Sequence, residues 1–150
     1  MSLEQEIKQT RPFKSNYEKM MVNILFTNNW ILFKQNKYLK QFDISIQQYN
    51  VLRILNGQKE QPITINEIIE RMLDKMSNAS RLVDKLFAKG YVSREQKVGN
   101  RRACDVRISP KCQLFLEEVT NALTKIENEM NSLDEEEFVE LNRLLDKLRT

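Results

Sequence analysis

The chain has 150 residues, of which 41% are hydrophobic and 30% are charged, and its formal net charge is +3. These values are typical of a soluble globular protein and exclude a largely disordered chain. No apolar run approaches the roughly 18–20 residues that span a bilayer, so no membrane partner is expected. The N-terminal sequence lacks the basic-then-apolar pattern of a secretory signal, and we therefore expect the protein to be cytoplasmic.

The sequence lacks histidine and the motifs that are typical of enzymatic or metal-binding chemistry. The chain has no histidine, which removes the commonest general base and metal ligand, and its two cysteines are Cys104 and Cys112. Two thiols alone make a poor zinc site, and the sequence has no glycine-rich phosphate loop. We therefore expect no enzymatic activity, no cofactor and no metal. The two cysteines are either reduced, semi-buried residues or a thiol switch.

Charge is distributed unevenly along the chain. Residues 71–111 contain eleven Lys or Arg and four Asp or Glu, which gives this segment a net charge of +7. Residues 112–150 contain four basic and ten acidic residues, a net charge of −6. This separation favours a basic module that meets a polyanion over an ordinary solvated surface.

The N-terminal part of the chain predicts two helices. Residues 1–13 show no periodicity and are expected to form a flexible N-terminus. Apolar residues then recur at helical spacing, which predicts one long helix over roughly 14–40. Ser45 and Gln48 have the spacing of a capping box, and the helix that they open closes before Gly57.

Two shorter helices follow. Thr64 and Glu67 have capping-box spacing and predict a helix that fades near Met72. Another helix is predicted to begin at Ser77 and to end at Lys89, before a glycine. Two short helices separated by a few residues, with a basic segment after them, are typical of a helix-turn-helix.

A hairpin and two helices complete the chain. Residues 104–108 alternate polar and apolar side chains cleanly, and residues 91–96 alternate loosely. With the Gly99-Asn100 turn between them, these segments predict a β-hairpin. Proline at the first helical position then predicts a helix from 110 to about 131. A capping box within residues 133–138 predicts the start of the last helix.

This order of elements predicts a mainly α fold with a small β-hairpin wing (α+β), a winged helix-turn-helix with long N- and C-terminal helices. Residues 43–109 are expected to form the winged lobe, and 14–42 with 110–150 a helical dimerisation region. The apolar stripes of the long helices exceed what one small core can cover, and a second copy of the chain is the simplest partner. The residues expected at this homodimer interface are Leu123, Leu141, Leu144, Leu145 and Leu148.

The second helix of the helix-turn-helix has the length that fits the major groove of B-DNA, with its N-terminal residues facing base edges. The residues available there are Ser77, Asn78, Ser80 and Arg81. Arg81 is expected to make the most specific contact, because arginine pairs bidentately with guanine. The residues expected to contact phosphates are Thr64, Lys75 and Lys85. An ordinary surface helix is the alternative for this segment.

The hairpin carries two adjacent arginines at its tip, Arg101 and Arg102. Folding provides no stabilising interaction for two like charges side by side on an exposed turn. Guanidinium groups suit the narrow minor groove, where A·T-rich sequence concentrates negative potential. We therefore expect this wing to contact the minor groove or its phosphates beside the helix in the major groove.

Residues 80–112, SRLVDKLFAKGYVSREQKVGNRRACDVRISPKC, resemble the recognition helix and wing of the MarR family of transcription regulators. The order and lengths of the predicted elements extend the resemblance to about residues 15–149. Arg102-Ala103 matches the Arg-Ala pair of the family's wing tip, which maps its minor-groove arginine to Arg102. Asn100 stands where the family usually has aspartate, so the charge that commonly braces the wing is missing.

The resemblance implies a homodimer that binds a pseudo-palindromic operator on double-stranded DNA, usually as a repressor. It also implies a pocket for a small phenolic or lipophilic effector. The candidate residues for this pocket are Trp30, Phe33, Tyr38, Phe42, Tyr49 and Arg53. Aromatic residues at helical spacing are also common in cores, which is the alternative for most of them. The peroxide-sensing branch of the family has a cysteine near the start of its first helix, where this chain has none.

An alternative function is a helical protein-interaction module whose basic segment binds an acidic protein partner. It accounts for the apolar stripes and the charge. It does not account for an arginine-tipped hairpin directly after a helix-turn-helix.

Overall fold

The computed structural model describes residues 1–59, 61–97, 99–130 and 132–150, and the side chains of residues 100–102 lie outside this description. The chain divides into two compact units, Met1–Ile46 and Gln47–Thr150. Among the described residues, no helix is long and apolar enough to cross a bilayer.

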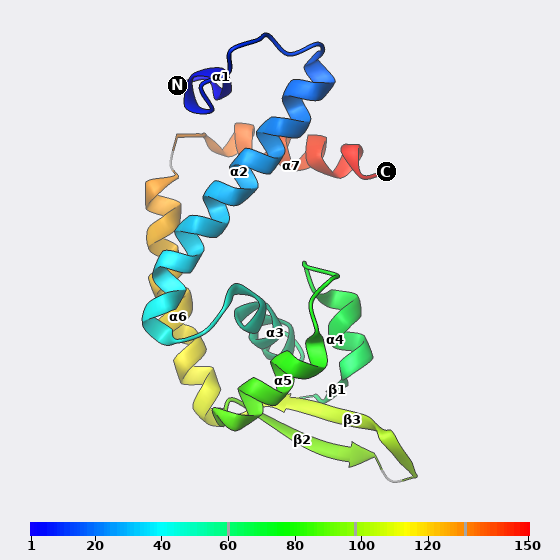
Figure 1. Ribbon diagram of the computed structural model, residues 1–150. Helices are drawn as coiled ribbons and strands as arrows, with labels where there is room; N and C mark the ends of the chain where they lie inside the picture. Colours follow the sequence, from blue (N-terminus) through cyan, green and yellow to red (C-terminus); the bar gives the residue numbers. More distant parts are fainter. Residues whose placement is uncertain (60, 98, 131) are drawn as a thin grey trace. The chain divides into compact units, whose positions relative to one another are not determined.

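The N-terminal unit consists of one long helix with short segments at its ends (Figure 1). Its elements are α1 (Leu3–Glu6), α2 (Asn16–Leu39) and the 3-10 helix η1 (Lys40–Phe42). Ser15 caps α2 by accepting a hydrogen bond from the Glu18 amide at 3.1 Å. The predicted long helix is confirmed. The segment expected to be flexible contains the single turn α1, which an ion pair of 2.6 Å between Glu4 and Lys19 joins to α2.

The C-terminal unit contains a helix-turn-helix, a small sheet and two further helices. Its elements are α3 (Ile46–Asn56), β1 (Ile63–Thr64), α4 (Ile65–Arg71), α5 (Ala79–Ala88), β2 (Val92–Lys97), β3 (Asn100–Ile108), α6 (Pro110–Glu129) and α7 (Glu135–Leu148). This is the predicted winged helix-turn-helix with one additional strand, β1.

The sheet is antiparallel with strand order β1-β3-β2. Val106 in the middle of β3 pairs with Ile63 of β1 on one side and with Arg94 of β2 on the other. β1 has two residues, too few to produce an alternating pattern, which explains why the sequence did not predict it. β3 begins at Asn100 rather than near residue 104, so the turn is shorter than expected and the strand backbone includes both arginines of the wing.

Polar caps fix the starts of the helices, and one predicted cap is wrong. The capping boxes at Thr64 and at Asp134 are confirmed. The helix predicted to begin at Ser77 instead has Asn78 as its N-cap, because the Asn78 Oδ1 accepts the Arg81 amide at 3.0 Å. The Ser77 amide donates to the Asp74 carbonyl at 3.2 Å, which keeps Ser77 in the preceding turn.

One apolar core lies within the C-terminal unit and receives side chains from α3, α4, α5, α6 and all three strands. Its fully buried members include Val51, Leu52, Ile68, Leu86 and Val106, whose exposed fraction is 0%. Because every element of the helix-turn-helix and the hairpin contributes to this core, burial of apolar surface holds the wing strands against the helices.

Ser109 connects the hairpin to α6. Its hydroxyl donates to the Gly90 carbonyl at 2.8 Å and accepts the Cys112 amide at 3.2 Å, which caps α6. Its own amide donates to the Tyr91 carbonyl at 3.0 Å. One side chain therefore satisfies backbone groups at the end of α5 and at the start of α6.

We predict that Ser109→Ala lowers the free energy of unfolding by about 1–2 kcal/mol, because two backbone groups lose their partner. Denaturant unfolding followed by circular dichroism measures this change. Ser109→Thr keeps the hydroxyl and should retain most of the stability. Ser132→Ala, at an exposed turn position, is the control, and an equal loss in this variant would contradict the assignment.

Candidate nucleic-acid interface

The first turn of α5 exposes part of the predicted base-reading set. Ser80 and Arg81 are exposed, and Arg81 makes no side-chain polar contact with any residue that the structure describes. The Ser77 hydroxyl is buried and has no hydrogen-bond partner within the described part of the chain. Ser80 and Arg81 are therefore presented to solvent, whereas the Ser77 hydroxyl is not.

Asn78 is exposed, but its side chain is partly occupied. Its Oδ1 accepts the Arg81 amide as the helix cap. Bidentate recognition of adenine requires the oxygen and the amide nitrogen of asparagine together. The Asn78 amide nitrogen can donate to a base or phosphate without disturbing the cap.

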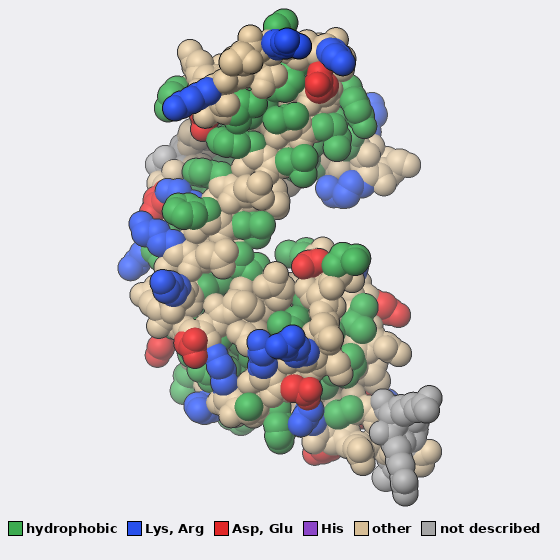
Figure 2. All heavy atoms as spheres, viewed as in Figure 1, with side chains coloured by type: hydrophobic (Ala, Val, Ile, Leu, Met, Phe, Trp, Pro, Cys, Tyr) green, Lys and Arg blue, Asp and Glu red, His purple; other side chains and the backbone are tan. Residues whose placement is uncertain are grey.

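A hollow of about 370 Å³ lies beside this turn and opens to solvent. Its lining residues are Gln47, Asp74, Ser77, Asn78, Arg81, Leu82 and Lys85. Arg81 and Lys85 are four residues apart and so lie on one face of the helix. Figure 2 shows Lys and Arg side chains gathered over the region of α3 and α5.

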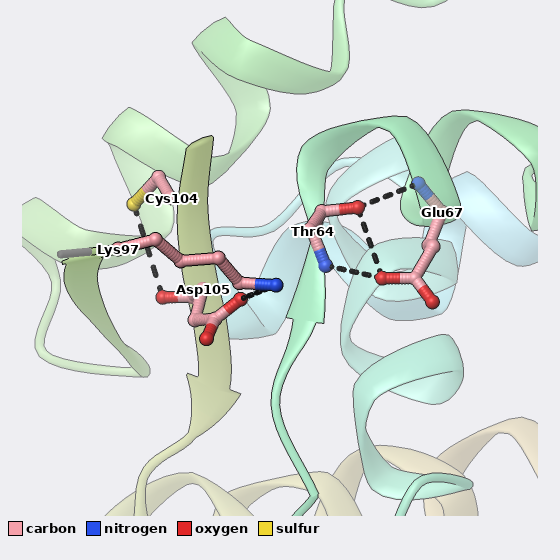
Figure 3. A network of polar contacts seen from close by, with 5 residues as sticks. All are labelled: Thr64, Glu67, Lys97, Cys104 and Asp105. Atoms are coloured by element: carbon pink, nitrogen blue, oxygen red, sulfur yellow. Dashed lines mark hydrogen bonds and ion pairs between the residues drawn. The ribbon is translucent and has the colours of Figure 1, made fainter. Parts of the chain in front are cut away.

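Two of the three predicted phosphate contacts have other partners. The Thr64 hydroxyl donates to the Glu67 carboxylate at 2.9 Å and accepts the Glu67 amide at 3.3 Å (Figure 3). The Lys75 ammonium donates to the carbonyls of Ile69 and Glu70 at the end of α4. Lys85 is exposed and available to a phosphate.

The backbone of Arg101 and Arg102 lies in β3, while their side chains and that of Asn100 lie outside the described residues. The structure therefore leaves the predicted contacts of the wing arginines as predictions. The same applies to the bracing of the wing through Asn100.

An ion pair joins β2 to β3 near the tip of the hairpin. The Lys97 Nζ lies 3.3 Å from an Asp105 carboxylate oxygen (Figure 3). Asp105 also pairs with Thr64 of β1 across the sheet. The pKa of Glu67 is lowered, chiefly by the hydrogen bond from the Thr64 backbone amide and then by that from the Thr64 hydroxyl, with smaller contributions from the charges of Arg71 and Lys97.

The sequence did not predict that Arg94 joins the hairpin to α5. Its guanidinium forms an ion pair with Asp84 and lies over the Phe87 ring, with the Cζ atom 4.3 Å from the ring centroid. Phe87 lies at the edge of the apolar face of α5, and 46% of its surface is exposed. An aromatic residue at the edge of that face, followed by an arginine in the next strand, was the available signal.

The predicted effector residues fall in different parts of the structure. Trp30 lines a pocket of about 570 Å³ with residues of α1 and α2. Arg53 lines a separate pocket of about 500 Å³ between α3 and α6. Tyr49 packs against the apolar core. This agrees with the alternative interpretation, in which the aromatic candidates are core residues. The remaining three candidates, Phe33, Tyr38 and Phe42, belong to the N-terminal unit and line neither pocket.

The predicted interface leucines leave a large apolar surface uncovered. Leu141, Leu144 and Leu148 are 45–48% exposed, and no residue of α7 is buried. Leu123 and Leu145 are half-buried. The apolar stripe predicted for the long N-terminal helix is also exposed on α2, at Tyr17, Met21 and Leu25.

The two cysteines have different surroundings. Cys112 is fully buried, and burial raises the pKa of its thiol to about 11 although the nearby Lys111 opposes the shift. Cys104 is half-buried, and its Sγ lies 3.8 Å from the Asp105 carbonyl oxygen. This environment favours a protonated, unreactive Cys112.

Comparison with known proteins agrees with this geometry. The sequence model of the MarR family matches residues 44–104, which run from the start of α3 into β3. Over this segment the chain is similar to the MarR family. It is 26% identical over 115 residues to the HTH-type transcriptional regulator SarZ of Staphylococcus saprophyticus, with 77% of each chain covered. It is 24% identical over 119 residues to the transcriptional repressor MprA of Escherichia coli, covering 77% of this chain and 68% of the relative.

Solved MarR structures share the fold. A cysteine-to-serine mutant of Escherichia coli MarR, complexed with operator DNA, superposes with a TM-score of 0.77 at 22% identity over 99% of both chains. The organohalide-sensing regulator RdhR, bound to 2,4-dichlorophenol, superposes with a TM-score of 0.81 at 19% identity, covering 94% of this chain and 86% of that one. The winged helix-turn-helix prediction is therefore confirmed.

We predict that Cys112 resists alkylation at pH 7–8, because its thiol stays protonated until the pH approaches about 11. Burial of the neutral thiol stabilises the fold below the unfolded pKa of ~8.5, and this contribution is lost as the pH rises from there. Iodoacetamide labelling of a Cys104→Ser variant, with and without denaturant, measures this difference. Equal labelling rates in the two conditions would contradict it.

Proposed function

We propose that the protein is a sequence-specific DNA-binding transcriptional regulator, most simply a repressor. The observation that carries the proposal is the exposed first turn of α5, where Arg81 has no polar partner among the described residues. A solvent-facing arginine at the N-terminus of the second helix of a helix-turn-helix suits recognition of guanine in the major groove. The +7 charge of residues 71–111 supports a polyanionic partner.

A homodimer is the proposed functional form. The exposed leucines of α7 and the exposed stripe of α2 provide apolar surface for a second copy of the chain. Two-fold symmetry would place recognition helices about 34–36 Å apart, or a multiple of that distance, on a pseudo-palindromic operator.

A small phenolic or lipophilic effector is proposed to release the DNA. The pocket between α3 and α6, which Arg53 lines, has a volume of about 500 Å³, within the range of small-molecule sites. RdhR has been solved with 2,4-dichlorophenol, and DNA binding by BpsR of Bordetella bronchiseptica is regulated by 6-hydroxynicotinic acid. Selection of bound genomic fragments, with and without such phenols, tests the operator and the effector together.

The proposal includes a cytoplasmic location and no enzymatic activity. The curated relatives are named as transcriptional regulators. The alternative, a module that binds an acidic protein, predicts no salt-dependent affinity for duplex DNA.

We predict that Arg81→Ala lowers affinity for the operator and leaves binding to random duplex nearly unchanged, because the lost contact is to a base. Arg102→Ala should weaken binding to both. If Arg102 neutralises one phosphate, this variant should also reduce the slope of log affinity against log salt by about 0.9. Fluorescence anisotropy at several salt concentrations measures all three quantities.

Arg143→Ala, on α7 outside the basic segment, is the control for this series and should bind like the wild type. A wild type that binds no duplex at low salt would contradict the proposed function.

We predict that Leu144→Glu disrupts the dimer and, through it, operator binding, since a charge in an apolar interface is costly to desolvate. Sedimentation velocity measures the oligomeric state. Asn142→Glu adds the same charge at an exposed position of α7 and should leave the dimer intact. A monomeric wild type would remove the basis of the prediction.

A further inference from the structure

The contacts of Arg94 connect the wing to α5 through two different interactions. Asp84 and Phe87 are three residues apart on α5 and therefore lie on neighbouring positions of one helix face. The Arg94 guanidinium bonds to the Asp84 carboxylate through Nη1 and lies over the Phe87 ring. A planar guanidinium can donate from its edge while its face stacks on an aromatic ring, and a lysine ammonium cannot reproduce this combination.

Strand periodicity explains why Arg94 reaches α5. Successive residues of a strand point to opposite faces, so Arg94 shares a face with the buried Val92. It extends the packed face of the hairpin beyond the apolar core, toward the tip. Glu95 and Lys97 lie on the other face, where Lys97 pairs with Asp105.

The charge of Arg94 is already neutralised. Its partner Asp84 lies on the proposed DNA-reading helix, and the side chains of Arg94 and Asp84 are 35% and 61% exposed. The pair adds no net charge to the basic segment, unlike the unpartnered Arg81. What the pair does contribute is a fixed position of β2 relative to α5.

We propose that Arg94 is a positioning residue for DNA binding, which sets the wing relative to the recognition helix through Asp84 and Phe87. The inference rests on the proposed DNA-binding function. A wing held in register with α5 allows the major-groove and minor-groove contacts to form together. A wing freed from α5 must be ordered again each time DNA binds, which costs conformational entropy.

Asp84→Asn gives the sharpest test, because two explanations predict opposite signs. If only charge matters, removal of a carboxylate from a DNA-facing helix tightens binding. If Arg94 positions the wing, the same variant weakens operator binding by about three- to tenfold, since the ion pair is lost. Glu95→Gln removes a neighbouring carboxylate without contacting α5 and is the matched control, which should bind as tightly as the wild type or more tightly.

Variants of Arg94 separate positioning from direct phosphate contact. Arg94→Lys keeps the charge but loses the stacked, edge-bonded geometry, and it should bind the operator about three- to tenfold more weakly. Arg94→Leu should show a similar loss with the salt slope unchanged. A slope reduced by about 0.9 would instead show that Arg94 contacts a phosphate and would overturn the proposal.

Anisotropy titrations with operator duplex provide these affinities, and thermal unfolding of each variant checks that it folds. Hydrogen exchange of the β2 and β3 amides should be faster in Asp84→Asn than in the wild type, with α3 unaffected. Tighter binding by Asp84→Asn, or wild-type affinity of Arg94→Lys, overturns the proposal. A wild type that does not bind duplex DNA overturns the proposed function, whereas wild-type binding with unaffected variants overturns only this inference.

Discussion

The position of β3 in the middle of the sheet is the constraint on which the C-terminal unit depends. Val106 is fully buried and pairs with both neighbouring strands, so the loss of its side chain would disturb β1, β2 and the helices packed on them. The same strand continues outward to Arg102 and Arg101 at the wing. The core and the predicted DNA contacts of the wing are therefore two ends of one continuous backbone segment.

Charge in this protein serves two separate purposes. Arg94, Lys97 and Lys75 are held by Asp84, by Asp105 and by backbone carbonyls respectively, and each fastens one element to another. Arg81 and Lys85 are exposed and have no such role among the described residues. The segment charge of +7 consequently overstates the number of cations available to a ligand, since a formal count does not distinguish these two groups.

Periodicity, caps and turn residues were sufficient to predict the helix-turn-helix, the hairpin and the long helices. These features are local, and tertiary structure did not override them. The cap of α5 was assigned one residue too early, because Ser77 and Asn78 are both good N-caps and only three-dimensional geometry selects between them. The pairing of β1 and the contacts of Arg94 could not be predicted, because they join residues that are distant in the sequence or on different elements. The side-chain positions of Arg101 and Arg102, for which the resemblance was strongest, stay predictions.

The short turn between Lys97 and Asn100 limits how such a wing can vary. Gly99 adopts a left-handed conformation with φ of 87°, and a Cβ atom there would meet no other atom within 4 Å, so backbone geometry rather than space favours glycine. In the regularly paired part of the hairpin, from Val92 to Gln96 on β2, one added residue would reverse which side chains face α5 and which face solvent. Two residues added to each strand there would preserve the alternation and lengthen the wing by roughly 7 Å. A designer who wishes to extend the regular part of the hairpin, up to the register shift after Gln96, should therefore insert residues in pairs.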